Sequence, residues 1–434
     1  MTKQTSVSAV IAAASDNVDS VATTDTSSIA TTRDATQGSR RRFLRHAAVA
    51  GGALATGLGA PAVLSQTKAP IRIGVLNSFT GVVAPSAETN WNGMQLYFDS
   101  IGWTIAGRKI ELIREDDQTN PQVGLQKARK FVDSDHVDLI CGPQGSNVAM
   151  AMLNYIKQTK TFLVVSGAGI DPITWERIPY MFRTSLSVYQ LCHPMGEWMY
   201  ANVAKEIVLT ATDYVGGRDV LRSFKEAYVA KGGKILKEIY PPMASADYSV
   251  YLTEIRALNP SAVYAFFPGT DSVRFIQQFA EQGLKAKTRI GGFAGLADPS
   301  TFEAQGKSAL GVLSSTHYTD TLDNPENKKF VADYLARYKS YPDSYSDYGF
   351  VAARVIAEAI KATDGDTSNK DRLSEAMAKV SFNAPRGPFR FDPVTHNPIQ
   401  DIHVVEAQDV GGRTANKVLA TIHEVRDPGV KPAA

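Results

Sequence analysis

Apolar and polar positions follow two regular patterns along this chain from residue 71 onward. Continuous apolar runs such as IRIGVLNSFTG (71–81) are typical of strands buried on both faces, and they end in loops that contain glycine. Between them, segments such as PQVGLQKARKFVDS (121–134) place apolar residues at helical spacing behind an initial proline. Strand and helix alternate in this way up to TFLVVSGAG (161–169). This order predicts a parallel sheet covered by helices on both faces.

The same alternation then starts again in the second half of the chain. It runs from EIVLTATDYVGG (206–217) to TRIGGFAG (288–295) and predicts a second sheet of the same kind. Two amphipathic helices are predicted at 327–341 and 347–362, and the residues from 387 onward predict strands and turns. The predicted fold class is therefore α/β, with two doubly wound parallel-sheet lobes.

Ligands of such sheets bind beyond the carboxyl ends of the strands, so the loops at these ends are the candidate binding segments. Each of them places Gly, Ser, Thr or Asp at the start of a helix, where free backbone N–H groups favour an anionic group such as a carboxylate. The loops are NSFTGVVAPSAE (77–88), GPQGSN (142–147), SGAGIDP (166–172), TDYVGG (212–217), PGTDS (268–272) and GFAGLADP (292–299).

The segment before residue 67 has a different character. A polar leader precedes SRRRFLR (39–45), which is followed by an apolar run at 47–64 and by small residues at 60–62. The order of basic, apolar and small residues predicts an export signal, and the wording resembles the twin-arginine type. We expect residues 1–66 to be leader and signal, with cleavage near 60–70 and a periplasmic product. A membrane anchor is the alternative, but the run is mostly Ala and Gly, so we expect no stable membrane insertion.

Composition narrows the function classes further. The chain has 434 residues, a formal net charge of +2 and two cysteines, Cys141 and Cys192. This charge gives no electrostatic reason to expect a nucleic-acid partner. The cysteines lie in different segments without CxxC spacing, so neither a disulfide framework nor a zinc site is indicated.

Catalytic and cofactor motifs do not emerge from the sequence. The acidic run EDD (115–117) is read as a strand end in solvent rather than a metal site, because further ligands at suitable spacing do not follow. SGAGIDP lacks the last glycine of GxGxxG, and GKS (306–308) lacks the first glycine of a P-loop. We therefore expect a protein without cofactor or metal that is not an enzyme. An exported hydrolase or other enzyme on the same scaffold is the alternative, and it would need a nucleophile–base pair in the cleft.

The loop segments together resemble the type I periplasmic solute-binding proteins of ABC importers, in the branched-chain amino acid branch. The resemblance extends from 71 to 398, and it is carried by segments that include LICGPQGSNVAMAM (139–152), VVSGAGIDPIT (164–174), NPENKKFVADYLARYK (324–339) and GPFRFDPVTHNP (387–398). It implies two lobes joined by three hinge crossings, near 187, 316 and 399. The first lobe would then hold 67–187 and 317–399, and the second lobe 188–316 and 400–434.

The resemblance also implies partners and a ligand between the lobes. The partners are ABC permease subunits with a separate ATPase, or a receptor if the protein is a sensor. Ser146 matches the serine that binds a ligand carboxylate, and backbone amides of Gly167, Ala168 and Gly169 match those that assist it. Tyr214 matches a tyrosine that closes over the ligand. Asp271 takes the place of the acid that receives an α-ammonium group.

Several assignments stay open at this point. Ser146 and Thr270 or Asp271 could instead cap helices. Ser86 lies near the position of an aromatic residue in many members, and Cys141 lacks the cysteine partner found in others. Other candidates for the pocket or for the core are Tyr318, Tyr189 and Trp91, and Arg183 is a candidate carboxylate partner or salt-bridge residue.

The predicted ligand is a small carboxylate-bearing solute, such as a branched-chain or other amino acid or an amide. An aromatic carboxylate of the benzoate or cinnamate kind is the alternative, because THYTDTLDNPENKKFV (316–331) resembles members that take up aromatic acids.

Overall fold

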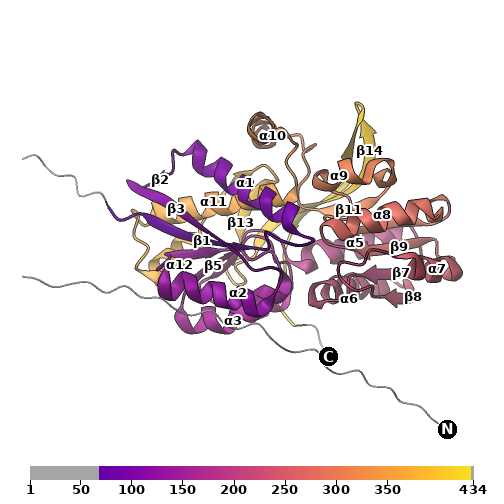
Figure 1. Ribbon diagram of the computed structural model, residues 1–434, viewed down its shortest axis with the longest axis horizontal. Helices are drawn as coiled ribbons and strands as arrows, with labels where there is room; N and C mark the ends of the chain where they lie inside the picture. Colours follow the sequence, from indigo (N-terminus) through magenta and orange to yellow (C-terminus); the bar gives the residue numbers. More distant parts are fainter. Residues whose placement is uncertain (1–67, 432–434) are drawn as a thin grey trace, which may run out of the picture. The chain divides into compact units, whose positions relative to one another are not determined.

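The computed structural model describes residues 68–431 (Figure 1), so the predicted export signal lies outside the described residues. The strands around the first sheet are β1 (Ile71–Asn77), β2 (Thr104–Ile105), β3 (Arg108–Asp116), β4 (Leu139–Cys141), β5 (Phe162–Val165) and β6 (Met181–Arg183). The helices that pack with them are α1 (Ala84–Ser100), α2 (Pro121–Arg129), α3 (Ser146–Thr159), α4 (Pro172–Trp175), α10 (Pro325–Tyr338), α11 (Ser344–Ala362) and α12 (Lys370–Ala378). We call this part the first lobe.

The strands of the second sheet are β7 (Glu206–Ala211), β8 (Lys234–Ile239), β9 (Ala262–Phe266), β10 (Arg289–Phe293), β11 (Leu313–Thr316), β12 (Ser381–Ala384), β13 (Gly387–Phe391), β14 (Pro398–Val410) and β15 (Arg413–Val425). Its helices are α5 (Val188–Asn202), α6 (Val215–Ala230), α7 (Ser249–Leu258), α8 (Thr270–Glu281) and α9 (Pro299–Gln305). We call β7–β11, β14, β15 and these helices the second lobe.

The first sheet has the strand order β2-β3-β1-β4-β5-β6, and β1 pairs in parallel with both β3 and β4. Ile73 and Val75 of β1 enter the apolar core shared with α1 and α11. Leu76 enters the core on the opposite face, under α2 and α3. Side chains of one strand thus fill both faces, which is why this strand reads as a continuous apolar run.

The second sheet has the order β12-β13-β14-β11-β10-β9-β7-β8, with β15 paired to β14. Strands β7, β8, β9, β10 and β11 are parallel to their neighbours among themselves, whereas β14 is antiparallel to β11 and to β15. The predicted α/β class with two parallel-sheet lobes is confirmed. The antiparallel ribbon β14–β15 extends the second sheet beyond its parallel part.

Three segments of the chain run between the lobes, and a buried arginine, Arg386, bonds two of them together. Arg386 donates hydrogen bonds to the carbonyl oxygens of Thr184 (2.8 Å) and Ser185 (3.1 Å), after β6, and to Oε1 of Gln400 (2.9 Å), in β14. Its guanidinium also pairs with Asp347 of α11, at 2.6 Å from Nε. The predicted lobe boundaries at 187, 316 and 399 remain predictions.

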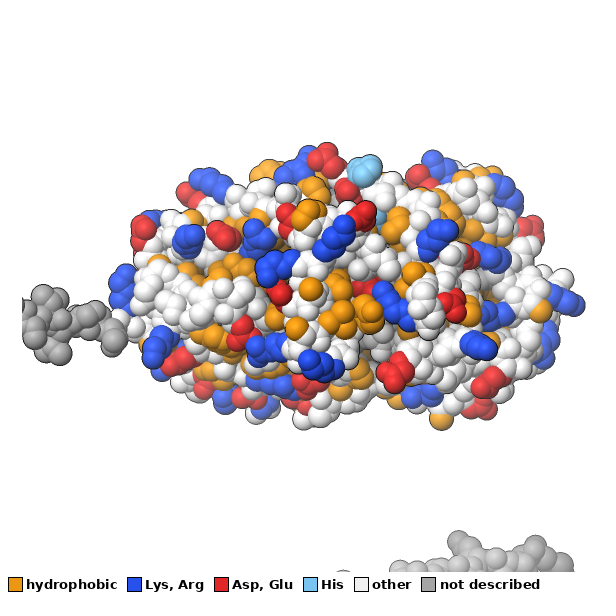
Figure 2. All heavy atoms as spheres, turned by 90° about the horizontal axis from the view of Figure 1, so that it is seen from above, with side chains coloured by type: hydrophobic (Ala, Val, Ile, Leu, Met, Phe, Trp, Pro, Cys, Tyr) orange, Lys and Arg blue, Asp and Glu red, His pale blue; other side chains and the backbone are white. Residues whose placement is uncertain are grey.

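The surface of the described residues carries both charge signs. On the face seen in Figure 2, Lys and Arg side chains are interspersed with Asp and Glu. Among residues 68–431, no helix has both the length and the hydropathy needed to cross a membrane.

Candidate functional site

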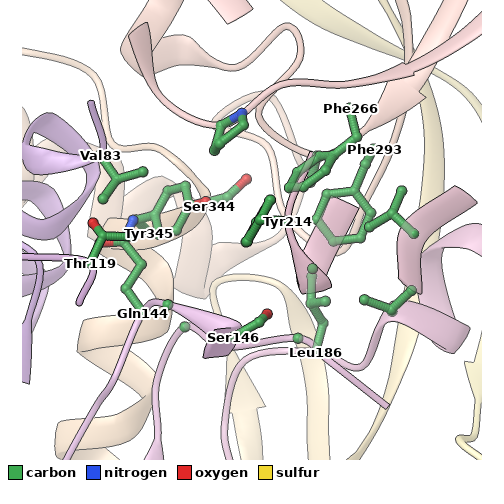
Figure 3. A pocket seen from close by; sticks show the side chains of 18 of the residues that line it. Val83, Thr119, Gln144, Ser146, Leu186, Tyr214, Phe266, Phe293, Ser344 and Tyr345 are labelled. Carbon is green, nitrogen blue, oxygen red and sulfur yellow. The ribbon is translucent and has the colours of Figure 1, made fainter. Parts of the chain in front are cut away.

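A cleft lies where the carboxyl ends of the strands of the two sheets face each other. The empty space in it is about 740 Å³ when the part that is open to solvent is included. Figure 3 shows residues of both lobes around it. The lining residues are Val83, Thr119, Gln144, Gly145, Ser146, Gly167, Gly169, Leu186, Val188, Tyr214, Gly216, Val220, Met243, Phe266, Pro268, Phe293, Ala294, Ser344, Tyr345 and Tyr348.

One end of the cleft is polar and lies at the N-terminus of α3. Ser146 is the first residue of this helix, and Gly145 before it is the N-cap, which provides no capping side chain. The Ser146 side chain therefore does not serve as the cap, although the sequence left that role open. The first N–H groups of a helix have no partner within the helix and carry partial positive charge. Hydroxyl and N–H groups at this end could together bind an anionic oxygen.

The rest of the cleft is largely aromatic. Tyr214 and Phe266 stack with ring centroids 6.3 Å apart, and Phe266 contacts Phe293 edge-on at 5.1 Å. Tyr345 and Tyr348 are contributed by α11. Burial raises the pKa of both Tyr214 and Tyr345 above the ordinary value, so their hydroxyls stay protonated at neutral pH.

Charged groups are absent from the described lining of the cleft, which contains no Asp, Glu, Lys, Arg or His. An acidic side chain is connected to the lining only through another residue. Ser344 lines the cleft, and its hydroxyl donates to the Asp298 carboxylate at 2.7 Å. Asp298 is itself buried, and its carboxylate also accepts a hydrogen bond from the Ser300 N–H.

Asp271 does not lie in the cleft. It is fully buried at the start of α8, where its carboxylate accepts a hydrogen bond from the Ala244 N–H (2.9 Å) and pairs with Arg274. Both of its oxygens are thus engaged within the second lobe. Gly269 is the N-cap of α8, without a capping side chain, so neither Thr270 nor Asp271 caps this helix.

Four other predicted site residues also lie outside the lining. Ser86 is buried in α1, where its hydroxyl donates to the Val83 carbonyl. Ala168 is buried, and its N–H donates to Pro143 instead of facing the cleft. Thr270 donates its N–H to the Val82 carbonyl. Tyr318 is buried in the small apolar cluster with Leu96, Phe330 and Tyr334. The cleft thus brings together Ser146, Gly167, Gly169 and Tyr214 of the predicted set.

The remaining candidates have structural surroundings. Arg183 is buried and donates to the carbonyl oxygens of Gly169, Ile170 and Leu186, so it shapes the loop around Gly169 instead of pairing with a carboxylate. Tyr189 stacks on His193, with centroids 4.6 Å apart. Trp91 packs edge-on against Phe79.

The acidic run 115–117 is not a strand end in open solvent. Glu115 pairs with Lys127 and Lys130, and Asp117 is buried against the Ser78 hydroxyl at 2.5 Å. Among the described residues, no group of three or more His, Cys, Asp and Glu side chains could hold a metal ion. Cys141 and Cys192 are both buried and free.

Several lining residues were not predicted from the sequence. Phe266 and Phe293 are the last residues of β9 and β10, and Gln144 lies in the loop GPQGSN between β4 and α3. The loops at these strand ends were predicted as candidate sites on the basis of their small polar residues, whereas the apolar and amide side chains beside them carry no such signal. Tyr345 and Tyr348 belong to α11, whose start carried no signal for a site.

Comparisons with known proteins agree with this geometry. The model of a family described as periplasmic binding protein matches residues 70–413. The "Leu/Ile/Val-binding protein homolog 6" of Brucella melitensis is 28% identical over 367 residues, which cover 83% of this chain and 94% of that protein. A solute-binding protein of an ABC transporter from Rhodopseudomonas palustris BisB5, solved with 3,4-dihydroxybenzoic acid, is 32% identical with a TM-score of 0.79. Another from R. palustris, solved with benzoate, is 31% identical with a TM-score of 0.78. Each of these two comparisons covers 83% of this chain and 99% of the other.

Proposed function

This chain belongs to the periplasmic binding protein family, and we propose that its cleft binds a small aromatic carboxylate. As a type I member of the branched-chain amino acid branch, it is a substrate-binding protein of an ABC transporter and not an enzyme. The proposal therefore concerns which solute it binds. It favours the aromatic acids over the amino acids that the sequence put first.

The observation that carries the proposal is the lack of charged side chains in the described lining of the cleft. An amino acid would bring an α-ammonium group into the site, and burying this cation without an acid beside it is costly. Asp271, the predicted partner for that group, is already engaged with Arg274 and the Ala244 N–H. A plain aromatic acid has no cation to bury, so it meets no such cost.

The two ends of the cleft match the two ends of such an acid. The carboxylate would bind at the N-terminus of α3, where Ser146 donates its hydroxyl and the backbone beside Gly167 and Gly169 closes the wall. The ring would lie among Tyr214, Phe266 and the other aromatic side chains, which favour edge and offset contacts with an aromatic ligand. The two R. palustris relatives were solved with acids of this class, which further supports the proposal.

Thermal-shift and calorimetric titrations test the proposal on the purified protein. We expect benzoate and 4-hydroxybenzoate to raise the melting temperature, because a ligand that binds only the folded state stabilises it. We expect leucine and phenylalanine to have little effect. Asp271→Ala should leave the affinity for aromatic acids within about twofold, because Asp271 lies outside the cleft. A rise in melting temperature with leucine that is lost in Asp271→Ala would contradict the proposal and would favour an amino acid as the ligand.

Transport and export complete the proposed role. We propose that the loaded protein delivers its ligand to ABC permease subunits driven by a separate ATPase, as importers of this family do. An uptake assay in cells that lack this chain tests it, and unchanged uptake together with a lost transcriptional response would indicate a sensor instead.

We also propose export through the signal at 39–66. Replacing Arg40 and Arg41 with Lys should keep the protein in the cytoplasmic fraction, whereas Arg42→Lys should not.

A further inference from the structure

Gln144 stands out in the cleft because its side chain is polar, enclosed and unpaired. Both amide atoms, Nε2 and Oε1, are buried, and neither makes a hydrogen bond of good distance and angle with a described residue, although the Tyr345 hydroxyl lies near enough to interact with the amide. A buried amide without a partner destabilises a protein, so such groups are rare unless they have a function. Gln144 also lines the cleft, so a bound ligand can reach it.

The backbone holds this side chain in place. Gly142 donates its N–H to the Val164 carbonyl (2.9 Å), and Ala168 donates to the Pro143 carbonyl (3.0 Å), so the loop before α3 is tied to β5 and to the loop that follows it. Gly167 packs directly on this loop, because a Cβ at residue 167 would lie 2.7 Å from the Gln144 Cα. The position of Gln144 is therefore part of the built wall of the cleft.

Its orientation separates it from the carboxylate end. Figure 3 shows the Gln144 side chain extending along the wall toward Thr119 and Tyr345, whereas Ser146 lies at another part of the cleft. An aromatic acid held at Ser146 by its carboxylate would thus direct part of its ring toward the Gln144 amide.

We propose that Gln144 is a specificity-determining residue that selects aromatic acids with a hydroxyl group on the ring, away from the carboxylate. This inference rests on the proposed function. A primary amide offers both donors and an acceptor, and a phenolic hydroxyl is both donor and acceptor, so the two groups can satisfy each other. A methyl substituent of similar size satisfies neither amide atom. A site with unpaired polar groups discriminates strongly against analogues that lack the matching group.

Calorimetric titration of three proteins with two ligands tests the proposal. The ligands are 4-hydroxybenzoate and 4-methylbenzoate, and the proteins are the wild type, Gln144→Met and Gln126→Met. Gln126 is exposed on α2 of the same lobe, so it is a matched control. We expect the wild type and Gln126→Met to bind the hydroxy acid about tenfold more tightly than the methyl acid. Gln144→Met should abolish or reverse this ratio.

The melting temperature of the ligand-free proteins gives a second measurement. Gln144→Met should melt no lower than the wild type, because an apolar side chain of similar length replaces a buried unpaired amide. An equal preference for the two acids in the wild type, or a ratio that survives in Gln144→Met, would overturn the role of Gln144 while leaving the aromatic-acid function intact. If aromatic acids fail to bind and an amino acid binds instead, the proposed function falls, and the inference falls with it.

Discussion

At the scale of single residues, function in the cleft depends on polar atoms that the protein leaves free. The Ser146 hydroxyl has no hydrogen-bond partner among the described residues, although the residue is 7% exposed. The Asp271 carboxylate, by contrast, is used entirely within its own lobe. Sequence reasoning treated the two residues alike, since both stand at the start of a helix. What separates them is the direction of the side chain, which depends on contacts distant in sequence.

Ser146→Ala should weaken ligand binding without weakening the fold. A hydrogen bond to a charged group contributes about 1.5–3 kcal/mol, so we expect the Kd for benzoate to rise about tenfold or more. The melting temperature of the ligand-free protein should stay close to that of the wild type, because the hydroxyl neither caps α3 nor pairs with another described group. Ser249→Ala is the control, since Ser249 is likewise the first residue of a helix, α7, but lies in the second lobe outside the cleft. A large loss of stability in Ser146→Ala would assign the residue to the fold instead.

Asp343 should make the stability of the protein depend on pH. Burial, followed by the nearby Asp298, raises the pKa of its carboxyl from 3.8 to about 7. Between these two values the folded protein holds a proton that the unfolded chain has lost. Stability contributed by this group is therefore present at acid pH and is lost as the pH rises toward 7, by up to about 1.4 kcal/mol per pH unit.

Melting curves of the wild type and Asp343→Asn at several pH values between 4.5 and 8 check this prediction. The asparagine oxygen can still accept the hydrogen bond from the Ser346 N–H, and its NH2 group can donate to the Thr89 hydroxyl, which is donor to the other carboxylate oxygen in the wild type. The melting temperature of Asp343→Asn should therefore increase relative to that of the wild type as the pH rises. Parallel curves at all pH values would show that Asp343 does not titrate in this range.

At the scale of elements, the sequence predicted most strands and helices of the parallel sheets but left out α5. The alternation of β1, α2, β4 and β5 could be predicted because each element buries a regular set of apolar positions. Helix α5 (Val188–Asn202) was not, and it carries Pro194 in its interior, which as a rule breaks a helix. The capping box of Ser187 and Gln190 and the packing of Leu191, Cys192, Met195 and Met199 in the second-lobe core stabilise it nevertheless. In α5, tertiary packing thus outweighs the helix-breaking preference of the proline. Sequence patterns reveal the proline but not the packing.

The contacts at the junction between the lobes could likewise not be predicted from sequence patterns. Arg386 and Asp347 are separated by 39 residues and are both fully buried, and their pair is joined by His317 at 3.3 Å. Burial and then Arg386 lower the pKa of His317 to about 3, so this histidine is neutral at neutral pH and cannot replace the arginine charge. Nothing local in the sequence marks these residues as partners.

Arg386→Met should therefore destabilise the protein strongly. Removing one member of a buried ion pair leaves the other uncompensated and costs about 3–5 kcal/mol. For a chain of this size, with an unfolding entropy of about 2.1 cal/mol/K per residue, we expect the melting temperature to fall by roughly 4–7 °C. The double variant Arg386→Met/Asp347→Leu should recover much of this loss, because no buried charge is left alone. If the double variant is as unstable as the single one, the hydrogen bonds from Arg386 to Thr184, Ser185 and Gln400 matter more than the charge pair.

At the scale of the whole described part, contacts on several sides of the cleft hold the lobes together. The Thr270 N–H donates to the Val82 carbonyl at 3.0 Å, next to Gly269, where a Cβ would collide with the same oxygen. Asp298 of the second lobe accepts from Ser344 of the first lobe. In a third contact between the lobes, Arg222 of α6 pairs with Asp171 of the first lobe at 2.8 Å. A ligand that touches both lobes favours this arrangement over one in which the lobes separate.

The Arg222 contact should control how readily the lobes close. Arg222 also pairs with Asp219 of its own helix at 2.7 Å, and Asp219 in turn accepts the Asp171 N–H. Two carboxylates thus approach each other at the lobe interface with the guanidinium between them. Burial, followed by repulsion from Asp219, raises the pKa of Asp171 well above its ordinary range. Without Arg222 the closed arrangement would bring two acids together uncompensated, so Arg222→Met should favour separated lobes.

Small-angle scattering and calorimetry measure this effect directly. We expect Arg222→Met to have a larger radius of gyration without ligand and a Kd for 4-hydroxybenzoate raised by about tenfold, because only the closed fraction binds well. Lowering the pH should restore part of the affinity, since protonation of Asp171, whose pKa is raised, relieves its repulsion with Asp219. Arg218→Met is the control on the same helix, because Arg218 pairs with the exposed Asp213 within the second lobe. If both variants bind equally well at every pH, the lobes close without help from the Arg222 contact, and ligand contacts alone drive closure.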